Sequence, residues 1–240
     1  SIEGVARAKE ELFAATRESG ILVINLDDSR IRELARKYRH RKITFAVHGE
    51  EGKQQADLWS SNMHMAEGGV ITFTLHYREE AVEIHLFIAG EHNVSNALCA
   101  AAICLAAGAS LQHIAAGLAD FRPPDKRMEM LRARSGFTII NDTYNANPAS
   151  MAAGLKTLRM ITGKSSVAVI GDMRELGAAA RQAHYDIGTL IAELAIDCVG
   201  VVGEFKETVV QSALDHAFPE DRLSLFDDKA GAARWIHDLV

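Results

Sequence analysis

The spacing of apolar residues divides the chain into two stretches with different rhythms. In the first, apolar residues recur at helical spacing over residues 5–17, and a continuous apolar run of strand length follows at Ile21–Asn25. Because that run has no polar face, we expect a sheet that is covered on both sides. The same patterns predict helices over residues 31–38, 93–107 and 111–121, and strands over residues 43–47, 70–76 and 82–88.

Beyond Pro123–Pro124, which is the only proline pair, the rhythm changes to strand, loop and helix. Strands are predicted at residues 138–140, 167–170 and 198–202, with one helix that ends at Gly163 and another that carries His184. Strands that alternate with helices in this way predict right-handed crossovers and a mainly parallel sheet. The sequence therefore predicts an α/β protein whose domain boundary separates residues 1–122 from residues 123–240.

Length and composition fit this two-domain organisation. The chain has 240 residues, of which 48% are hydrophobic and 24% are charged, which is typical of a soluble globular protein. The 26 lysines and arginines are outnumbered by 32 acidic residues, so the formal net charge of −6 lacks the signature of a nucleic-acid-binding protein. No apolar run reaches the ~18 residues of a membrane span. We therefore expect neither a nucleic-acid partner nor a membrane span.

The three cysteines, Cys99, Cys104 and Cys198, show no metal-binding or disulfide spacing and lie among apolar residues. We interpret them as reduced core residues of a cytosolic protein. The N-terminus carries neither an initiator methionine nor a signal pattern, so we expect the chain to be a segment of a longer protein.

Two polar loops follow predicted strands of the second half, and in open α/β sheets ligands bind beyond the carboxyl ends of the strands. In Asn141–Pro148, the Asp142 carboxylate could contact a ribose or metal-bound oxygen, and the Asn147 amide could contact a nucleotide base. Turn formation and helix capping explain these residue types equally well. The loop Gly171–Gly177 lacks the G-x-G-x-x-G pattern, which favours a structural turn over dinucleotide binding.

Three further segments carry candidate binding groups. Gly90–Asn96 opens a helix, where Asn93 and Asn96 could bind a purine or a phosphate, or could cap the helix. Arg127 follows the proline pair and could reach a polyphosphate when two domains close, although such an arginine is more often a solvated surface charge. The basic stretch Arg30–Lys42 is interpreted as a solvated helix face or a docking surface rather than a nucleic-acid site.

Four motifs occur in order along the chain: GEHNVSN at Gly90–Asn96, GLADFRPPDKRME at Gly117–Glu129, NDTYNANPASM at Asn141–Met151, and GDMRELG at Gly171–Gly177. In this order and at this spacing, with His184 downstream, they resemble the Mur ligase family. The resemblance begins at SIEGVARAKEELF and runs to the C-terminus, and it is weakest across residues 30–66 and after Gly203. The third and fourth motifs are most similar to the members that join D-alanyl-D-alanine to UDP-N-acetylmuramoyl-tripeptide.

The resemblance implies a bacterial cytoplasmic ligase of peptidoglycan synthesis that uses ATP and Mg²⁺. Such an enzyme activates the carboxylate of UDP-N-acetylmuramoyl-tripeptide as an acyl phosphate, which the amine of D-alanyl-D-alanine attacks. The alternatives are another Mur ligase or folylpolyglutamate synthase, which share the ATP chemistry but use a different amine. A non-catalytic nucleotide-binding module is a further alternative from a different functional class.

For the fold, the resemblance implies that residues 1–122 are the rear part of a central ATP-binding domain. Residues 123–240 would then be a Rossmann-like C-terminal ligase domain that is truncated at its end. We expect the full-length protein to be monomeric. Because strands of the central domain would be missing, we expect residues 1–122 to expose a sheet edge and apolar surface, and the fragment to self-associate.

The resemblance also assigns roles to individual residues. Lys9 and Arg127 are the implied catalytic residues: Lys9 matches a lysine that is carbamylated and bridges magnesium ions in related ligases, and Arg127 matches an arginine that reaches the phosphates. The implied nucleotide-binding residues are His92, Asn93, Asn96, Arg127, Asp142, Tyr144, Asn145 and Asn147. The implied substrate contacts are Tyr144, Asn147 and Ser150.

The 240 residues contain no glycine-rich GKT phosphate loop, whose backbone N–H groups and lysine would hold the β- and γ-phosphates. We therefore predict that this polypeptide alone does not catalyse ligation. A phosphate-release assay with the tripeptide precursor, D-alanyl-D-alanine and ATP should show no turnover by the isolated chain. Turnover by the isolated chain would refute the argument from the missing loop.

Overall fold

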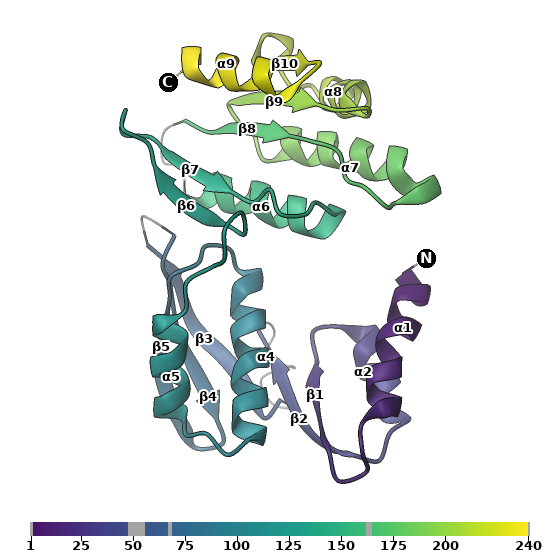
Figure 1. The fold of residues 1–240 in the computed structure, drawn as a ribbon, viewed down its shortest axis with the longest axis vertical. Helices are drawn as coiled ribbons and strands as arrows, with labels where there is room; N and C mark the ends of the chain where they lie inside the picture. The colour runs from purple at the N-terminus through teal and green to yellow at the C-terminus, as the bar shows by residue number, and fades with distance from the viewer. Residues whose placement is uncertain (1, 48–55, 67–68, 162–164, 240) are drawn as a thin grey trace. The chain divides into compact units, whose positions relative to one another are not determined.

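The computed structural model describes residues 2–47, 56–66, 69–161 and 165–239 (Figure 1). Within these residues the chain forms two compact units, and the division along the chain falls between Arg122 and Pro123. The short segment Ile88–Gly90 groups with the second unit although it precedes this division. The predicted helix end at Gly163 lies outside the described residues.

The first unit contains a five-stranded sheet in which a parallel half continues into an antiparallel half. Its strands lie in the order β1 (Ile21–Asn25), β2 (Arg41–Ala46), β3 (Leu58–Met65), β4 (Ile71–Tyr77) and β5 (Glu80–Leu86). The first three pair in parallel, whereas β4 is antiparallel to both of its neighbours. The predicted strands are confirmed with small shifts at their ends. The apolar pattern misses β3, because serine, asparagine and histidine interrupt it.

Helices cover both sides of β1, as the continuous apolar run of this strand predicts. The helices of the first unit are α1 (Ile2–Ala15), α2 (Ser29–Arg36), α4 (His92–Ala106) and α5 (Leu111–Asp120). Both α2 and α4 contact β1, and Figure 1 shows α1 and α2 on one side of this strand and α4 on the other. The carboxylate of Asp28 starts α2 by accepting hydrogen bonds from the N–H groups of Arg30 and Ile31 (2.9 and 3.0 Å).

The basic stretch Arg30–Lys42 runs along α2 into β2, and part of it joins two helices of the same unit. Arg30 lies 3.9 Å from the Glu3 carboxylate, and Lys37 lies 3.0 Å from that of Glu10. Both acidic residues belong to α1. These pairs fit the interpretation of the stretch as a solvated or docking surface.

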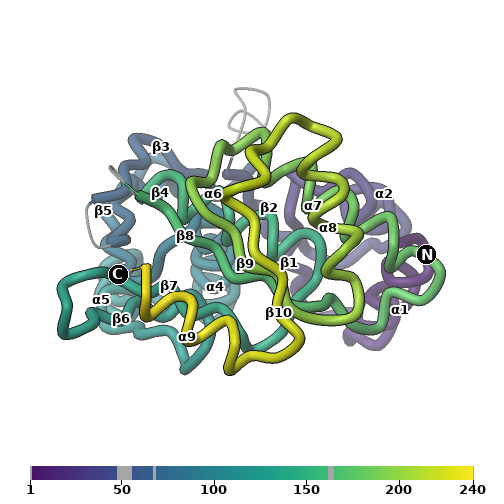
Figure 2. Tube along the Cα trace, turned by 90° about the horizontal axis from the view of Figure 1, so that it is seen from above, coloured from purple at the N-terminus to yellow at the C-terminus, as the bar shows by residue number. Residues whose placement is uncertain are grey.

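The second unit contains a three-stranded parallel sheet and a separate two-stranded hairpin. The sheet has the order β10 (Leu223–Phe226), β9 (Cys198–Val202), β8 (Val167–Ile170), and the hairpin pairs β6 (Glu129–Arg132) with β7 (Thr138–Asn141) (Figures 1 and 2). The parallel sheet is confirmed. The prediction that residues 138–140 belong to it is wrong, because β7 pairs antiparallel with β6 instead.

Helices of the second unit bury the apolar sides of β8 and β9. They are α6 (Pro148–Ile161), α7 (Ala180–Glu193), α8 (Lys206–Asp215) and α9 (Lys229–Leu239). Buried Ile187, Ile191 and Val209 pack with Val199 and Val201 of β9 in one core. The helices α7 and α8 lie side by side (Figure 2), close enough that a Cβ on Gly188 would overlap the Val209 carbonyl oxygen. Gly188 thus sets the spacing of the two helices.

All three cysteines are free, as expected, but the prediction that they lie in the core is wrong. Cys104 is exposed, and Cys99 and Cys198 are half-buried. Cys99 and Cys104 lie on α4, where small alanines rather than cysteines face the sheet. Among the described residues, no helix is long and apolar enough to cross a membrane.

A side-chain pair ties the start of β8 to the start of β9. The Asp197 carboxylate accepts hydrogen bonds from the backbone N–H and the hydroxyl of fully buried Ser166 (both 2.8 Å). The Ser166 hydroxyl oxygen in turn accepts the Asp197 N–H (3.1 Å). The bond from the Ser166 hydroxyl, followed by that from its N–H, lowers the pKa of Asp197 below its usual range.

This lowered pKa predicts a pH-dependent contribution to stability. A carboxyl whose pKa is lower in the folded state stabilises the fold above its unfolded pKa of about 3.9, and this contribution is lost as the pH falls through the folded pKa. We expect Asp197→Asn to lower the free energy of unfolding by about 1 kcal/mol at pH 7, the scale of a charge-assisted hydrogen bond at a partly exposed site. In urea denaturation, the difference from wild type should shrink towards zero below pH 4. A difference that is independent of pH would contradict this assignment.

Candidate functional site in the second unit

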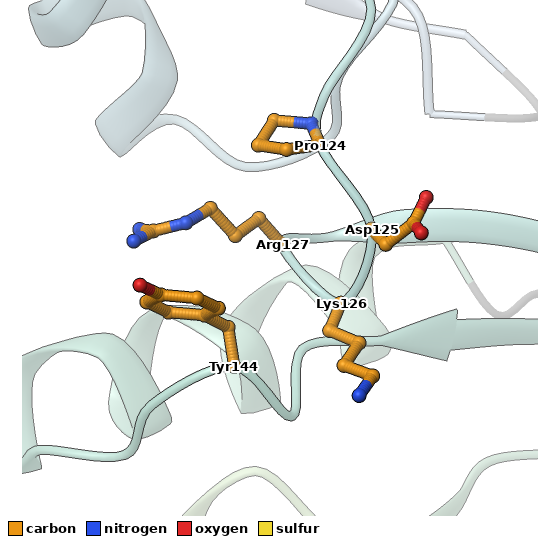
Figure 3. Close-up of a pocket in the computed structure, with 5 residues that line it drawn as sticks. All are labelled: Pro124, Asp125, Lys126, Arg127 and Tyr144. Atoms are coloured by element: carbon orange, nitrogen blue, oxygen red, sulfur yellow. The ribbon is translucent and has the colours of Figure 1, made fainter.

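The turn before β6 and the loop after β7 together line an open pocket of about 680 Å³. Its lining residues are Pro124, Asp125, Lys126, Arg127 and Tyr144 (Figure 3). Figure 3 shows the side chains of Arg127 and Tyr144 extending in the same direction, from the turn and from the loop respectively. The pocket lining thus combines two cations, one carboxylate, a phenol ring and a proline.

The turn before β6 has left-handed backbone on both sides of Arg127, and the Arg127 side chain is exposed. Lys126 and Met128, on either side of it, have φ angles of +64° and +51°, in the left-handed region that residues other than glycine rarely adopt. Such conformations cost of order 1–3 kcal/mol each and persist only where surrounding contacts enforce them. Met128 supplies one such contact, because its side chain is buried.

Three hydrogen bonds hold this turn, one to Glu129 at the start of β6 and two to the loop that follows β7. The Glu129 carboxylate accepts the Lys126 N–H (3.1 Å), and the Asp142 carboxylate accepts the Met128 N–H (3.1 Å). The Lys126 carbonyl oxygen accepts the Tyr144 N–H (3.0 Å). The N–H groups of the strained residues Lys126 and Met128 therefore both have side-chain acceptors. The bond from Tyr144 also joins the loop after β7 to the turn.

The Arg127 guanidinium stacks on the phenol ring of Tyr144. Its central carbon lies 3.9 Å from the ring centroid, within the range of a cation–π interaction. The Tyr144 side chain remains 63% exposed, so the pair faces solvent. Among the residues that the structure describes, no carboxylate pairs with Arg127. The guanidinium is ordered by the ring, and its N–H groups remain available to an anionic ligand.

Asp142 and Glu129 serve this turn in ways that the sequence only partly indicates. Half-buried Asp142, which the resemblance places near a ribose, uses one carboxylate oxygen to hold Met128. Glu129 bonds both Lys126 and the Asn141 amide (3.0 Å), although sequence reasoning assigned it no role. A carboxylate just beyond the arginine is the signal that could have indicated it.

Asn147 and Ser150 cap the N-terminus of α6. The Asn147 side-chain oxygen accepts the Ser150 N–H (2.9 Å), and the Ser150 hydroxyl oxygen accepts the Asn147 N–H (3.1 Å). The Asn145 side-chain oxygen accepts the N–H of Ala146 (3.0 Å). Asn147 thus caps the helix in this structure, as the capping alternative predicts. Asn145 and Asn147 lie in the loop that carries Tyr144, and Ser150 lies in the first turn of α6.

The remaining candidate residues belong to the first unit. His92, Asn93 and Asn96 lie in the first turns of α4, where the Asn96 amide donates to the side-chain oxygen of buried Asn93 (3.1 Å). This bond fixes the orientation of the Asn93 amide. Lys9 lies on an exposed face of α1. The structure therefore splits the predicted site residues between the two units.

The described residues do not form a magnesium site by themselves. No group of three or more histidine, cysteine, aspartate or glutamate side chains lies close enough together in them to hold a metal ion. Asp142, the one carboxylate predicted for the nucleotide, is engaged with Met128. The protein groups in the described residues thus do not form a metal cage by themselves.

Comparison with known proteins connects both units to one family. The pattern of the Mur ligase middle domain matches residues 1–104, and that of the Mur ligase, glutamate ligase domain matches residues 126–240. The chain belongs to the Mur ligase family. The sequence resemblance carried by the four ordered motifs is thereby confirmed.

Similar proteins within the Mur ligases share one name. The chain is 36% identical over 223 residues to the UDP-N-acetylmuramoyl-tripeptide–D-alanyl-D-alanine ligase of Mycobacterium leprae, covering 85% of this chain and 43% of that protein. It is 34% identical over 205 residues to the ligase of the same name from Escherichia coli, covering 85% and 44%. A crystal structure of MurF from Acinetobacter baumannii superposes with a TM-score of 0.86 at 30% identity, covering 100% of this chain and 49% of that one. The chain thus spans less than half the length of these relatives.

The bond between Asp142 and Met128 predicts how the Arg127 turn can be loosened. Asp142→Ala removes the acceptor of the Met128 N–H, whereas Asp142→Asn keeps an oxygen in the same place. Because a buried N–H without a partner costs about 1–3 kcal/mol, amide exchange at Met128 and Tyr144 should be roughly tenfold or more faster in the alanine variant. Hydrogen exchange measured by NMR should show little change in the asparagine variant. Equal acceleration in both variants would mean that the hydrogen bond does not order the turn.

Proposed function

We propose that this chain is part of an ATP-dependent ligase that joins D-alanyl-D-alanine to UDP-N-acetylmuramoyl-tripeptide in the bacterial cytoplasm. The similarity to ligases with that name, at 34–36% identity over 85% of this chain, carries the proposal. Residues 1–122 would be the rear part of the central ATP-binding domain, and residues 123–240 the C-terminal ligase domain. We propose that the whole protein acts as a monomer.

The chemistry explains why such a ligase needs a cation at the nucleotide. A carboxylate is a poor electrophile, so its oxygen first attacks the γ-phosphorus of ATP, and ADP leaves. The dipeptide amine then attacks the acyl carbon of the resulting acyl phosphate, inorganic phosphate leaves, and the amine loses a proton to give the amide. Negative charge shifts between the phosphoryl oxygens in the first step, and a fixed cation stabilises it.

Arg127 is the residue of the second unit that we propose for this role. Its guanidinium is exposed, is held by stacking on Tyr144, and has no carboxylate partner among the described residues. An arginine in this state can donate two parallel hydrogen bonds to a phosphate. Asp142 would then act on the nucleotide both near the ribose and through the turn that it holds.

The other predicted residues keep their proposed roles. His92, Asn93 and Asn96 would contact the adenine, and the bond from the Asn96 amide to the Asn93 side-chain oxygen supports this role because it fixes the orientation of the Asn93 amide. The loop after β7 and the start of α6 would contact the nucleotide and the incoming dipeptide, through Tyr144, Asn145, Asn147 and Ser150. Lys9 would be carbamylated and would then supply one carboxylate ligand for Mg²⁺.

The activity is tested with the complete enzyme that contains this chain. ADP formation should require both UDP-N-acetylmuramoyl-tripeptide and D-alanyl-D-alanine. Single amino acids and folate substrates should not replace the dipeptide. Turnover with a single amino acid would support another Mur ligase, turnover with folates would support folylpolyglutamate synthase, and no turnover would support a nucleotide-binding module.

Arg127→Met should lower kcat/KM by about a hundredfold or more, the usual effect of removing one group that stabilises transition-state charge. Arg134→Met is a matched control, because Arg134 is also exposed and lies between β6 and β7, away from the pocket lining. Equal kcat/KM values for the two variants would show that Arg127 does not take part in the reaction.

Lys9→Arg keeps the positive charge but cannot be carbamylated in the same way. We expect kcat to fall in this variant, and mass spectrometry or an electron-density map of the wild type should show the added carboxylate. An unmodified amine and an unchanged kcat at saturating Mg²⁺ would contradict the role of Lys9.

A further inference from the structure

A carboxylate joins the loop after β8 to the loop after β9 in the second unit. Asp172, in Gly171–Gly177, accepts hydrogen bonds from the N–H groups of Glu204 (2.8 Å) and Phe205 (3.1 Å). Gly203 has a φ of +125°, and a Cβ at this position would overlap the Asp172 carboxylate. The second loop is therefore shaped around this carboxylate.

A buried histidine holds the same loop from the other side. His184 of α7 is 1% exposed, and its Nε2 accepts the Met173 N–H (2.9 Å). Because Nε2 is an acceptor, the ring proton is on Nδ1, which donates to the Ala180 carbonyl oxygen (2.7 Å). The ring also stacks on Phe205, with centroids 4.4 Å apart and planes 15° apart. A neutral imidazole in one tautomer thus satisfies the hydrogen bonds of both ring nitrogens, and Nε2 also lies 3.9 Å from the Asp172 carboxylate.

These contacts leave two charged side chains facing outwards. Met173 is buried, whereas Arg174 and Glu175, which follow it, are exposed. Glu175 has a φ of +63°, a strained value that the fixed neighbours enforce. Neither Arg174 nor Glu175 forms an ion pair within the described part of the chain. The hydrogen bonds of Asp172 and His184 thus hold the loop after β8 from within the protein. Among the described residues, the Arg174 guanidinium just beyond the carboxyl end of this parallel strand has no ion-pair partner.

We propose that His184 is a positioning residue for the ligase reaction, holding the loop so that Arg174 contacts an anionic group of a substrate. The inference rests on the function proposed above. The anionic group is either a phosphate of the nucleotide or the carboxylate of the dipeptide, which share the chemistry that a guanidinium recognises. His184 itself does not touch the substrate, because its ring is buried and both of its nitrogens are bonded within the protein.

Two substitutions at His184 separate the positioning bond from the rest of the side chain. Gln places an acceptor where Nε2 lies, so His184→Gln keeps the bond to the Met173 N–H. Asn reaches only the position of Nδ1, so His184→Asn keeps the bond to Ala180 and loses the bond to Met173. His216→Asn is the matched control, because His216 also bonds a carbonyl one helical turn earlier (2.8 Å), and its ring contacts Tyr185 of α7.

In the complete enzyme, His184→Asn should raise one KM by about tenfold, the scale of one lost buried hydrogen bond, while kcat changes much less. A rise in the KM of D-alanyl-D-alanine identifies the carboxylate as the ligand, and a rise in the KM of ATP identifies a phosphate. His184→Gln should restore most of the affinity, and His216→Asn should behave like wild type. Thermal unfolding is measured for all three variants to separate folding from positioning.

Arg174→Met tests the other half of the inference without disturbing the scaffold. It should raise the same KM, and His184→Asn should add no more than about twofold on the Arg174→Met background, because the histidine acts through the arginine. Independent, multiplying effects would overturn the proposal, as would unchanged KM values in Arg174→Met or in a folded His184→Asn variant. If the wild type shows no dipeptide-dependent turnover, the proposed function fails. Amide exchange of Met173 in the two His184 variants would then still decide whether this histidine holds the loop.

Discussion

Backbone N–H groups in the loops of the second unit have no partner in a sheet, and buried or half-buried side chains supply the acceptors. Asp142 accepts from Met128, Asp172 accepts from Glu204 and Phe205, and His184 accepts from Met173. A buried N–H without an acceptor costs about 1–3 kcal/mol, which is a large part of the net stability of a domain. These few acceptors therefore determine which loop conformation is stable.

The same arrangement orients the residues that face solvent. In each loop, the backbone N–H of a buried methionine donates to a side-chain acceptor, and the adjacent arginine is exposed. The two pairs are Met128 beside Arg127 and Met173 beside Arg174. Left-handed residues flank the first arginine and follow the second. The apolar side chain anchors the backbone in the core, and the charged side chain keeps its donors free. Two cations at the ends of the second unit's strands are thus presented on rigid backbone.

The first unit presents its candidate residues differently, from the start of a long helix rather than from a loop. Alanines on the buried face of α4, such as Ala97 and Ala101, allow the helix to approach the sheet closely. Asn93 lies on the same buried face, one turn before Ala97, and is oriented by Asn96. Because the helix is fixed by packing, these amides need no strained backbone to hold their positions.

The sequence by itself determined the family, the two halves and most of the regular elements. Continuous apolar runs such as Ile21–Asn25 and residues 198–202 predict buried strands directly, because the pattern depends only on residues that are neighbours along the chain. Residues 138–140 were assigned to the wrong sheet because the antiparallel partner β6 has only four residues, with charged residues at both ends, and strand pairing is a non-local choice. From the sequence, Asn147 fitted a helix cap and a ligand-binding residue equally well, and only the folded structure shows its reciprocal hydrogen bonds with Ser150. Likewise, the tertiary structure alone decided that Asp142 and His184 serve as acceptors. Whether a polar side chain binds the backbone depends on which N–H group folding brings within hydrogen-bonding distance, and no pattern along the chain records that.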